Sequence, residues 1–511
     1  MKLVAIVAIF MCSVALTRGY KILGVFSYCA HSHFSLGYRI ASELAARGHD
    51  VTMITCKPQR KGVKNLKEVS VEGLKKHLQS FNADLADFGQ MSFWGQLEWI
   101  KGLGIAYTEY VLTAPEVKQL WNSNQEFDLV VMEHFINDAA TIFHHRFNCP
   151  LVILAPGPMS MMNNYLVGNL APPSYVPSIL GNYDAEMNYW ERLSNTYKFI
   201  MGEIFMHTKF IPAHNELLKR VFPDAPDLNT ILYNASLILI TSHVSLIDAM
   251  PLQQNIKEIG GYHVTDPEPL PKNLIDFLDS AKNGAIIFSM GSNLKSSDFE
   301  PEKKRAILKA FSKIKQKVLW KFETDLPEKS DNVMISSWLP QKDALAHPNV
   351  IGFIGHGGLL GTIEAIYHGV PILGMPIFWD QMKNIEEAVR KGYGVKLNFA
   401  DLTEETFEKS LNELINNPKY REGAKTRSKI MHDQPTKQID EAMFWIEYVV
   451  RHKGAPHLRS QSVKLRWYQL YLLDVIALPI LAVVILVFVI RQCVNFVVFS
   501  KKSSNKKAKK H

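Results

Sequence analysis

The chain has 511 residues, more than one hydrophobic core usually sustains, and its 47% hydrophobic content is ample for two domains. The formal net charge is +8, but Lys2 and Arg18 lie in an N-terminal leader and six lysines follow Phe499, so the rest is balanced. The positive balance therefore does not indicate a nucleic-acid-binding protein, and no nucleic-acid partner is expected.

The first 19 residues have the pattern of a cleaved secretory signal. Lys2 precedes an apolar run from Leu3 to Leu16, and small residues stand before Tyr20. Of the five cysteines, Cys29, Cys56 and Cys149 lie between this leader and the C-terminal apolar stretch. Three cysteines allow one disulfide but imply no disulfide framework.

A strand, a helix and a second strand are predicted next. The apolar run Ile22 to Phe26 leads into a loop with His31 and His33, then a helix ending at residues 47–49, then the strand Val51 to Thr55. A neutral imidazole accepts a proton near neutral pH, although a loop histidine is often only a surface residue. This segment therefore offers two candidate bases.

A carboxylate could assist such a base. Phe127 to Glu133 is predicted as a strand that ends in an acid, and Asp138 follows five residues later. A carboxylate can orient a histidine ring and stabilise its imidazolium. Glu133 could also be an ordinary solvated strand end.

Residues 245–285 form a polar segment that contains three prolines between Asp266 and Pro271. We interpret it as a linker, since strands and helices alternate on both sides of it. The predicted fold is α/β, with two Rossmann-like doubly wound domains facing a cleft. Ligands bind at the carboxyl ends of the strands in such domains.

The second half contains the richest cluster of motifs. Ala285 to Ser289 is a predicted strand that runs into Gly291 and Ser292, and Trp338 and Gln341 follow. The flat indole ring suits stacking on a base, but an ordinary core tryptophan would give the same pattern.

The segment from Val350 to Asn384 predicts a site for a nucleotide sugar. Val350 to Ile354 reads as a strand, His356-Gly357-Gly358 as a turn, and residues 361–368 as a helix. Glycines let a pyrophosphate approach unpaired N–H groups at a helix start, although plain α/β proteins also use such turns. Glu364 could accept hydrogen bonds from two ribose hydroxyls, and Asp380 with Gln381 could bind sugar hydroxyls.

Together these motifs resemble the UDP-glycosyltransferase family (glycosyltransferase family 1, UDP-glucuronosyltransferase-like, of the insect type). The matching residues are His356-Gly357-Gly358, Glu364-Ala365, Gly369-Val370-Pro371, Pro376, Asp380-Gln381 and Asn384, preceded by residues 337–341 and His347-Pro348. The resemblance implies the GT-B fold. It also implies that the donor is bound by Gly291, Ser292, Trp338, Gln341, His356, Gly357, Gly358, Glu364, Asp380 and Gln381.

The resemblance further implies the catalytic pair. The family's catalytic histidine stands 16 residues before the position of His49, which gives His33, with His31 as the near alternative. Glu133 occupies the position of the family's helper aspartate, and Asp138 is a fallback. The expected reaction inverts the anomeric carbon, with UDP-sugar as co-substrate and no other cofactor. No metal is expected, because Asp-x-Asp and zinc-spaced motifs are missing from the sequence.

One departure concerns the donor sugar. Leu359-Leu360 replaces the Ser-Asn of many vertebrate relatives. Insect members with Leu-Leu usually take UDP-glucose, so glucose is favoured and glucuronic acid stays open. The resemblance implies small lipophilic acceptors, and aromatic residues from Phe88 to Tyr110 and methionines from Met159 onward suit an adaptable apolar pocket. These side chains could equally pack against helices or lipid.

The C-terminal region predicts a membrane anchor. Leu470 to Ile490 is long enough to cross a bilayer, and the lysines after it favour a cytoplasmic tail. The catalytic body would then lie in the lumen of the endoplasmic reticulum. Lys507 and Lys509 resemble a dilysine retrieval signal, although a stop-transfer flank would look similar. Asn234 begins the one glycosylation sequon, directly before a predicted strand.

Two alternative functions and the state of assembly stay open at this level. An inert relative could bind nucleotide or lipophilic ligands without transfer, a membrane hydrolase would need a nucleophile that the sequence does not offer, and a homo-oligomer is compatible with the chain.

The predicted divisions are a signal peptide (1–19), an N-terminal acceptor domain (20–250), a linker (251–284), a C-terminal UDP-sugar domain (285–440), a helical segment (441–469), a transmembrane helix (470–490) and a lysine-rich tail (491–511).

Overall fold

The computed structural model describes residues 19–59, 61–80, 88–89, 91–181, 183–292, 294–377 and 379–508. Side chains at 79–80 and beyond residue 496 are not described, and the predicted signal peptide lies outside the described residues except for Gly19. The chain divides into two units, a body that ends at Arg459 and a C-terminal unit that begins at Ser460.

The first sheet of the body has the strand order β3-β2-β1-β4-β5-β6-β7, and every neighbouring pair is parallel. Chain order reverses between β1 and β4, which is the topological switch point of a doubly wound sheet. Its strands are β1 (Lys21–Phe26), β2 (Asp50–Thr55), β3 (Leu66–Ser70), β4 (Leu129–Glu133), β5 (Leu151–Ala155), β6 (Ala235–Ile240) and β7 (Ile256–Glu258).

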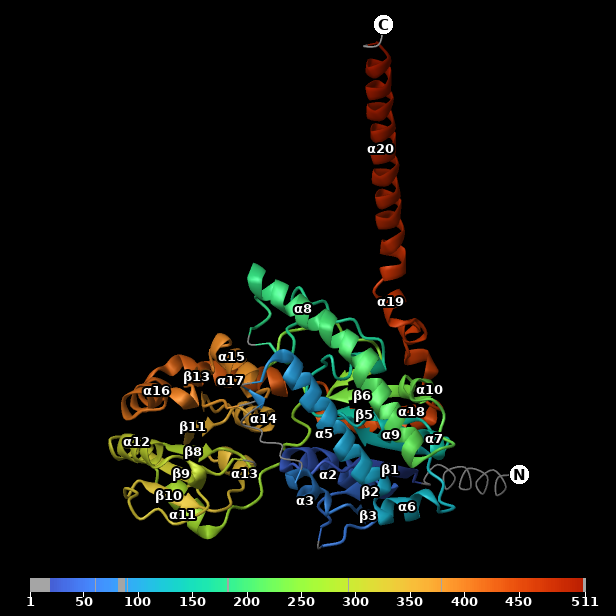
Figure 1. Ribbon diagram of the computed structural model, residues 1–511. Helices are drawn as coiled ribbons and strands as arrows, with labels where there is room; N and C mark the ends of the chain where they lie inside the picture. The colour runs from blue at the N-terminus through green and yellow to red at the C-terminus, as the bar shows by residue number, and fades with distance from the viewer. Residues whose placement is uncertain are drawn as a thin grey trace, which may run out of the picture. The chain divides into compact units, whose positions relative to one another are not determined.

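The second sheet has the order β10-β9-β8-β11-β12-β13 and is also parallel throughout, with its switch point between β8 and β11. Two doubly wound α/β sheets confirm the predicted fold class (Figure 1). The strands are β8 (Ala285–Ser289), β9 (Lys317–Lys321), β10 (Val333–Ser336), β11 (Val350–Gly355), β12 (Ile372–Gly374) and β13 (Gly394–Lys396).

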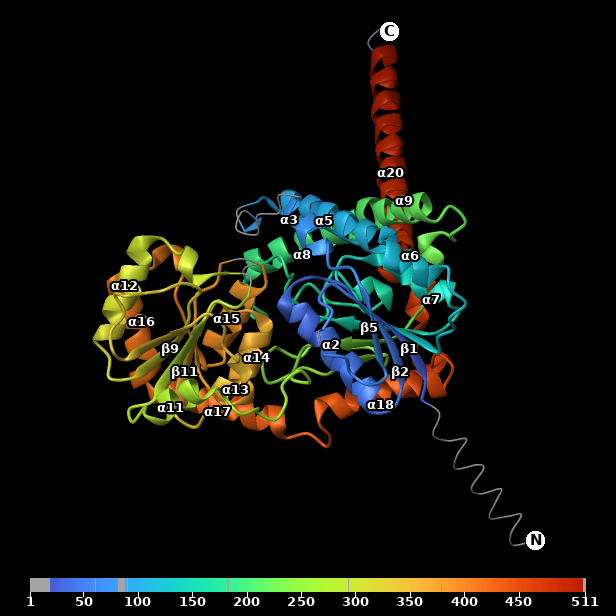
Figure 2. The same cartoon turned by 90° about the horizontal axis from the view of Figure 1, so that it is seen from below.

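Helices connect the strands and cover both sheets (Figures 1 and 2). In chain order the body contains α2 (His31–Ala46), α3 (Leu74–Ser80), α5 (Phe93–Thr113), α6 (Pro115–Trp121), η1 (Asp138–Thr141), α7 (Ile142–Arg146), η2 (Asn164–Leu166), α8 (Tyr189–Phe205), η3 (Met206–Phe210), α9 (Ile211–Val221), α10 (Leu228–Leu232), α11 (Lys272–Asp279), η4 (Ser296–Asp298), α12 (Pro301–Ser312), α13 (Gln341–Leu345), α14 (Leu359–Tyr367), α15 (Gln381–Arg390), η5 (Phe399–Asp401), α16 (Glu404–Asn416), α17 (Pro418–His432), α18 (Gln438–Arg451) and η6 (Pro456–Leu458).

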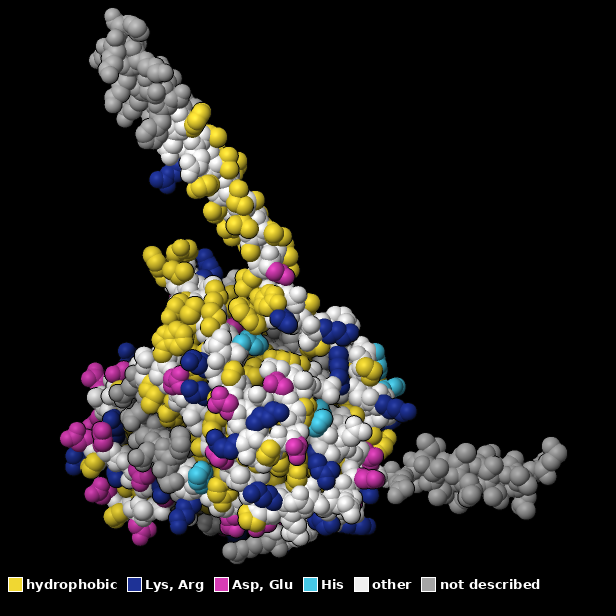
Figure 3. Space-filling view, turned by 45° about the vertical axis from the view of Figure 1, so that its right-hand side comes forward, with side chains coloured by type: hydrophobic (Ala, Val, Ile, Leu, Met, Phe, Trp, Pro, Cys, Tyr) yellow, Lys and Arg dark blue, Asp and Glu magenta, His cyan; other side chains and the backbone are white. Residues whose placement is uncertain are grey.

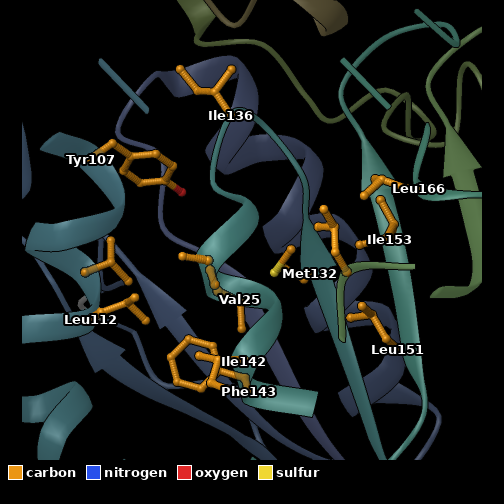
Figure 4. Close-up of a cluster of buried hydrophobic side chains, with 14 of the residues drawn as sticks. Val25, Tyr107, Leu112, Met132, Ile136, Ile142, Phe143, Leu151, Ile153 and Leu166 are labelled. Carbon is orange, nitrogen blue, oxygen red and sulfur yellow. The ribbon is translucent and has the colours of Figure 1, made fainter. Parts of the chain in front are cut away.

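The strands are apolar on both faces because helices bury both faces of a parallel sheet. In β5, Leu151 and Ile153 face one core with α5 and α7, whereas Val152 and Leu154 face the opposite core with α2 and α18. Figure 4 shows the first of these cores, where Tyr107 of α5 and side chains of β1, β4 and β5 gather. The alternation fixes the register of each strand, since a slip by one residue would exchange the two faces.

Two segments differ in structure from a simple two-domain division of the sequence. The expected linker at 251–284 contains β7, which pairs with β6, and α11. Helix α18 lies after the second sheet in sequence but packs on the first sheet, where Ile439, Met443 and Ile446 are buried against β6 and α2. The polypeptide therefore crosses between the two sheets twice.

One disulfide joins Cys29, just after β1, to Cys56, just after β2, and Cys149 is free. This is one of the three pairings that these cysteines could form, and the sequence alone did not choose among them. It ties the chain after β1 to the chain after β2, close to the start of α2.

The C-terminal unit contains η7 (Gln461–Lys464), α19 (Trp467–Leu470) and α20 (Leu473–Ala508). Within α20, the stretch Leu473–Phe496 has the length and hydropathy of a membrane span, and its side chains are exposed. This span begins and ends slightly later than the predicted 470–490.

Helix α18 provides a test of the second crossing. Ile446→Ala should lower the free energy of unfolding of the body by about 2–5 kcal/mol, because the side chain is fully buried. Urea denaturation followed by tryptophan fluorescence would measure the loss. The matched control is Phe444→Ala in the same helix, whose side chain is half exposed and should cost less than about 0.5 kcal/mol. Equal midpoints for the two variants would contradict the packing of α18 described above.

Candidate active site

The two switch points face a common cleft of about 840 Å³ within the body. Its lining comes from the carboxyl ends of both sheets, including the segments after β1, β4 and β5 and the segments after β8, β11 and β12. All the predicted donor-binding residues line this cleft, and so does His33. A cleft at paired switch points is the expected place for a ligand in doubly wound domains.

A histidine–glutamate pair lies on the first-sheet side. His33 Nδ1 and Glu133 Oε1 are 2.8 Å apart, and the side chains are 15% and 1% exposed. A neutral His33 that donates its Nδ1 proton to the carboxylate keeps Nε2 as an acceptor, and His33 lines the cleft. Glu133 thereby fixes the ring and can stabilise the imidazolium that forms when Nε2 takes a proton.

The histidine is not in a loop, as the sequence suggested, but in the first turn of α2. Ala30 is the N-cap residue with an extended backbone, so the helix already begins at His31. Phe135 and Tyr28 pack against the His33 ring at centroid distances of 4.6 and 4.7 Å. These aromatic walls restrict the ring to the orientation that meets Glu133.

The two alternative residues are engaged elsewhere. The ring of His31 lies edge-on to Trp338 at 5.3 Å, and burial lowers the pKa of His31. Asp138 is fully buried, accepts a hydrogen bond from the Tyr165 hydroxyl and lies 3.3 Å from His134 Nε2. His33 with Glu133 is therefore the pair that the geometry favours as base and helper.

Glycines surround His356 on the second-sheet side. A Cβ at Gly291 would lie 2.7 Å from the His356 ring, and a Cβ at Gly358 would lie 2.5 Å from it. Gly291 and Gly357 also have φ of +80° and +81°, which L residues with a Cβ rarely adopt. The missing side chains make room for the His356 ring, and glycines at a helix start also let a pyrophosphate approach the backbone.

His356 itself offers a neutral hydrogen-bonding group. Burial lowers its pKa to about 4, and Nδ1 has no partner among the described residues. A neutral imidazole can donate to a diphosphate oxygen but adds no positive charge until an anion binds. The anion would then favour protonation of the ring.

The start of α14 explains the Leu359-Leu360 pair. Leu360 packs against the core between the first sheet, α2 and α18, and Leu359 lies 3.9 Å from where a Cβ at Gly157 would be. Leu360 thus contacts the first-sheet half of the body, whereas Leu359 packs on the core of the second-sheet half. Apolar side chains are favoured at these positions by these contacts, which sequence reasoning about polar donor contacts missed.

The groups expected to hold the nucleoside lie together. Gln341 Nε2 donates to Glu364 Oε2 at 2.7 Å, and His263 Nε2 is 3.9 Å from the other carboxylate oxygen. Burial raises the pKa of Glu364 to about 7 and lowers that of His263 to about 4. Trp338 is 57% exposed, so its ring face is accessible to a base.

The groups expected to hold the sugar are already partly bonded. The Asp380 carboxylate accepts from Asn384 Nδ2 at 2.7 Å and from the backbone of Leu359, while burial raises its pKa. Gln381 Oε1 accepts from the backbone N–H of Ile377 at 2.9 Å. Ser292 is exposed at the rim. These hydrogen bonds hold the side chains of Asp380 and Gln381 in place in the absence of a sugar.

Two cleft residues were not singled out from the sequence. Trp379 has φ of +60° and inserts among Phe88, Trp99 and Phe135 of the other half of the body. Lys383 lines the cleft in the first turn of α15, and burial lowers its pKa. The sequence signal for both was their position beside Asp380-Gln381.

Apolar side chains contribute to the first-sheet side of the cleft. Beside His33 it is lined by Trp99, Leu103, Met159, Met162 and Ile179, from α5 and from the loops after β5. The aromatic and methionine segments noted in the sequence therefore contribute to the pocket as well as to the core. Among the described residues, no group of three or more His, Cys, Asp or Glu side chains could hold a metal ion.

Comparisons with known proteins agree with this geometry. Residues 23–510 match the family described as UDP-glucoronosyl and UDP-glucosyl transferase. UDP-glycosyltransferase UGT5 of Dactylopius coccus is 36% identical over 97% of each chain, and human UDP-glucuronosyltransferase 2B7 is 32% identical over 94% of each. UDP-glucosyltransferase 2 of Dactylopius coccus is 33% identical over 99% of this chain and 98% of its own.

Solved structures share the fold at lower identity. The calicheamicin glycosyltransferase CalG4 is 18% identical with a TM-score of 0.57, covering 84% of this chain and 99% of its own. LpCGTa in complex with UDP is 17% identical with a TM-score of 0.52, covering 85% and 99%. The body therefore has the GT-B fold. With the family match along nearly the whole sequence, the chain belongs to the UDP-glycosyltransferase family, enzymes that transfer a sugar from a UDP-sugar.

Proposed function

We propose that the enzyme transfers a hexosyl group, glucose in preference, from a UDP-sugar to a hydroxyl of small lipophilic acceptors with inversion at the anomeric carbon. The observation that carries the proposal is the His33–Glu133 contact of 2.8 Å beside an apolar half-cleft, facing the glycine-rich cradle around His356.

The reaction follows from these positions. His33 Nε2 accepts the proton of the acceptor hydroxyl, and the oxygen forms a bond to the anomeric carbon as the bond from that carbon to the UDP oxygen breaks. The negative charge on UDP is stabilised by the N–H groups at the start of α14 and by His356. Glu133 stabilises the imidazolium throughout, because opposite charges attract strongly in a partly buried site.

Glucose as the preferred sugar is supported by the Leu359-Leu360 pair and by the 33% identical relative named UDP-glucosyltransferase 2. With leucines at these positions, the first two residues of α14 offer the donor no polar side chain, and the Leu359 N–H already donates to Asp380.

Glucuronic acid is the second candidate donor, and Lys383 favours it. Its ammonium lies in the cleft wall close enough to Asp380 and Glu387 for their charges to raise its pKa against the larger effect of burial. The ammonium group of Lys383 would attract the carboxylate of a glucuronic acid donor.

The endoplasmic reticulum is the proposed location, with the body in the lumen. The Cys29–Cys56 disulfide fits an oxidising compartment. The apolar stretch Leu473–Phe496 followed by lysines fits a type I anchor with a cytoplasmic tail.

The catalytic pair is tested by substitution. His33→Ala should lower kcat by at least about a thousandfold, because it removes the proposed base. Glu133→Gln should lower kcat by about 10²–10⁴-fold, because it removes the negative charge that stabilises the imidazolium of His33. Product formation from labelled UDP-glucose with a panel of phenols measures both. The control is His31→Ala, which should change kcat far less. Activity of His33→Ala equal to that of the unchanged enzyme would refute the proposed mechanism.

Donor binding should depend on pH through Glu364. Its pKa is raised to about 7, so the carboxylate is mostly protonated below pH 7 and mostly ionised above it. Because the ionised form accepts hydrogen bonds from both ribose hydroxyls, KM for the donor should fall as pH rises from 6 to 8. Glu364→Gln, which does not titrate, should have a higher KM and a flat profile. A profile that Glu364→Gln leaves unchanged would assign the pH dependence to another group.

Lys383 should decide between the donors. Lys383→Ala should raise KM for UDP-glucuronate by roughly tenfold or more and leave KM for UDP-glucose within about twofold, since only the former carries a carboxylate. Lys342→Ala, at another wall of the cleft, is the control and should affect both donors alike. Equal effects of Lys383→Ala on both donors would remove the support for glucuronate.

A further inference from the structure

The turn that follows β4 contains a strained residue. Ile136 is buried and has φ of +54°, a left-handed conformation that a β-branched residue rarely adopts. Such a conformation is costly and persists only where the surrounding structure holds it. The turn connects Glu133, at the end of β4, to Asp138, at the start of η1. The groups that hold Ile136 in this conformation therefore also determine how the chain leaves Glu133.

The side chain of Asn137 holds this turn together. Its Oδ1 accepts from the Phe135 backbone N–H at 2.9 Å, and its Nδ2 donates to the Glu133 carbonyl oxygen at 3.1 Å. Because Asn137 is buried, removal of its amide would leave these backbone groups without an equivalent partner, which is costly. One side chain thus binds the backbone of both residues of this turn that contact His33.

The Glu133 carboxylate has little else to fix it. Its Oε1 lies 2.8 Å from His33 Nδ1, whereas its Oε2 has no hydrogen-bond partner among the described residues. The position of the carboxylate therefore depends on the backbone that carries it and on the packing around it. The Phe135 ring packs against the same histidine at a centroid distance of 4.6 Å. Both contacts with His33 depend on the path of residues 133–137.

Helix α5 packs closely against the turn. A Cβ at Gly104 would lie 2.5 Å from the Ile136 carbonyl oxygen, so a larger residue would not fit where the helix meets the turn. Three residues on, the Tyr107 hydroxyl forms a hydrogen bond with Ser27 Oγ at 2.9 Å and also contacts the Asn137 side chain. Ile136 and Tyr107 lie at the same end of the first core (Figure 4). The turn is thus enclosed on the side of α5.

We infer that Asn137 is a positioning residue for sugar transfer: by holding Ile136 in its left-handed conformation, it keeps Glu133 and Phe135 against His33. The inference rests on the roles proposed for His33 and Glu133. Asn137 is not part of the cleft lining, whereas Phe135 and Ile136 are. It therefore acts through its neighbours and does not touch the substrates.

A purely structural role is the competing explanation for a buried asparagine. A residue that only stabilises the fold changes the fraction of folded enzyme and leaves kcat of the folded molecules unchanged. A residue that aligns the base lowers kcat in molecules that still bind the donor normally, because donor binding depends on the other side of the cleft. Turnover therefore has to be measured together with donor binding.

The first test removes the amide of Asn137. Because apolar side chains cover the C-terminal helix α20 (Figure 3), every variant is studied as the full chain in detergent. Asn137→Ala should lower kcat at least about tenfold and leave Kd for UDP, measured by calorimetry, and KM for UDP-glucose within about twofold. Undiminished kcat would overturn the inference.

The matched control is Asn332→Ala. The amide of Asn332 also holds backbone groups, since its Nδ2 donates to three carbonyl oxygens of the second-sheet half, but Asn332 does not line the cleft. This variant should lose stability and keep its kcat. A kcat lowered as much as in Asn137→Ala would show that loss of any such amide has this effect, and would overturn the inference.

The second test is rescue at residue 136. In the Asn137→Ala background, Ile136→Gly should give a kcat at least about threefold higher than Ile136→Ala, because both remove the side chain but glycine adopts positive φ without strain. In the otherwise unchanged chain, where Asn137 holds the turn, the same two substitutions should differ less. Equal kcat for the two double variants would overturn the inference, since the conformation of residue 136 would then not matter.

The outcomes separate the inference from the proposed function. Absence of transfer by the unchanged enzyme would refute the proposed function and the inference with it. Transfer that His33→Ala abolishes and Asn137→Ala leaves intact would refute the inference alone. If Asn137→Ala does not bind UDP, Tyr107→Phe takes its place, because it removes only the hydroxyl beside Asn137. It should lower kcat several-fold at an unchanged Kd for UDP, and an unchanged kcat would overturn the inference.

Discussion

The parallel pairing of β1 with β4 and of β8 with β11 determines where every part of the site lies. At each of these pairs the connecting helices leave for opposite faces of the sheet, so a crevice opens at the carboxyl ends. Val25 pairs with Met132, so Glu133 ends its strand just where the chain from β1 turns into α2 and presents His33. In the second sheet Gly355 pairs with Ser289, which places His356 beside Gly291. Register thus sets both contacts.

Burial then gives the two sides of the cleft different chemistry. On the first-sheet side Glu133 is almost fully buried, and a buried carboxylate needs a partner that can bear positive charge, which His33 provides. On the second-sheet side the pKa of His356 falls and that of Glu364 rises, both through burial. The second-sheet side therefore presents a neutral His356 ring beside the glycines, whereas Glu364 changes its charge around neutral pH.

The sequence was sufficient for features whose cause is local. Apolar runs predicted the strands β1, β4, β8 and β11 to within two residues, and the glycine turn predicted the start of α14. The resemblance supplied His33 and Glu133 as a pair, which the structure brings into contact. Features with distant causes were missed. Helix α18 packs on α2 some 400 residues away, as the contact of Arg47 with Asp440 shows. The apolar periodicity of α18 predicts a buried face but does not indicate which element covers it.

The same limit applies to the contact across the cleft, where Trp379 and Leu360 of the second-sheet half pack among residues of the first-sheet half. Asp248 adds ion pairs with Arg390 and Lys391, but these side chains are partly exposed, and such pairs are worth at most about 1 kcal/mol each. The aromatic contacts of Trp379 with Phe88 and Phe135 bury more apolar surface and so contribute more to holding the halves together. Since Phe135 also packs on His33, the residue that joins the halves is one ring away from His33. Trp379 therefore links the contact between the two halves to the aromatic wall beside the proposed base.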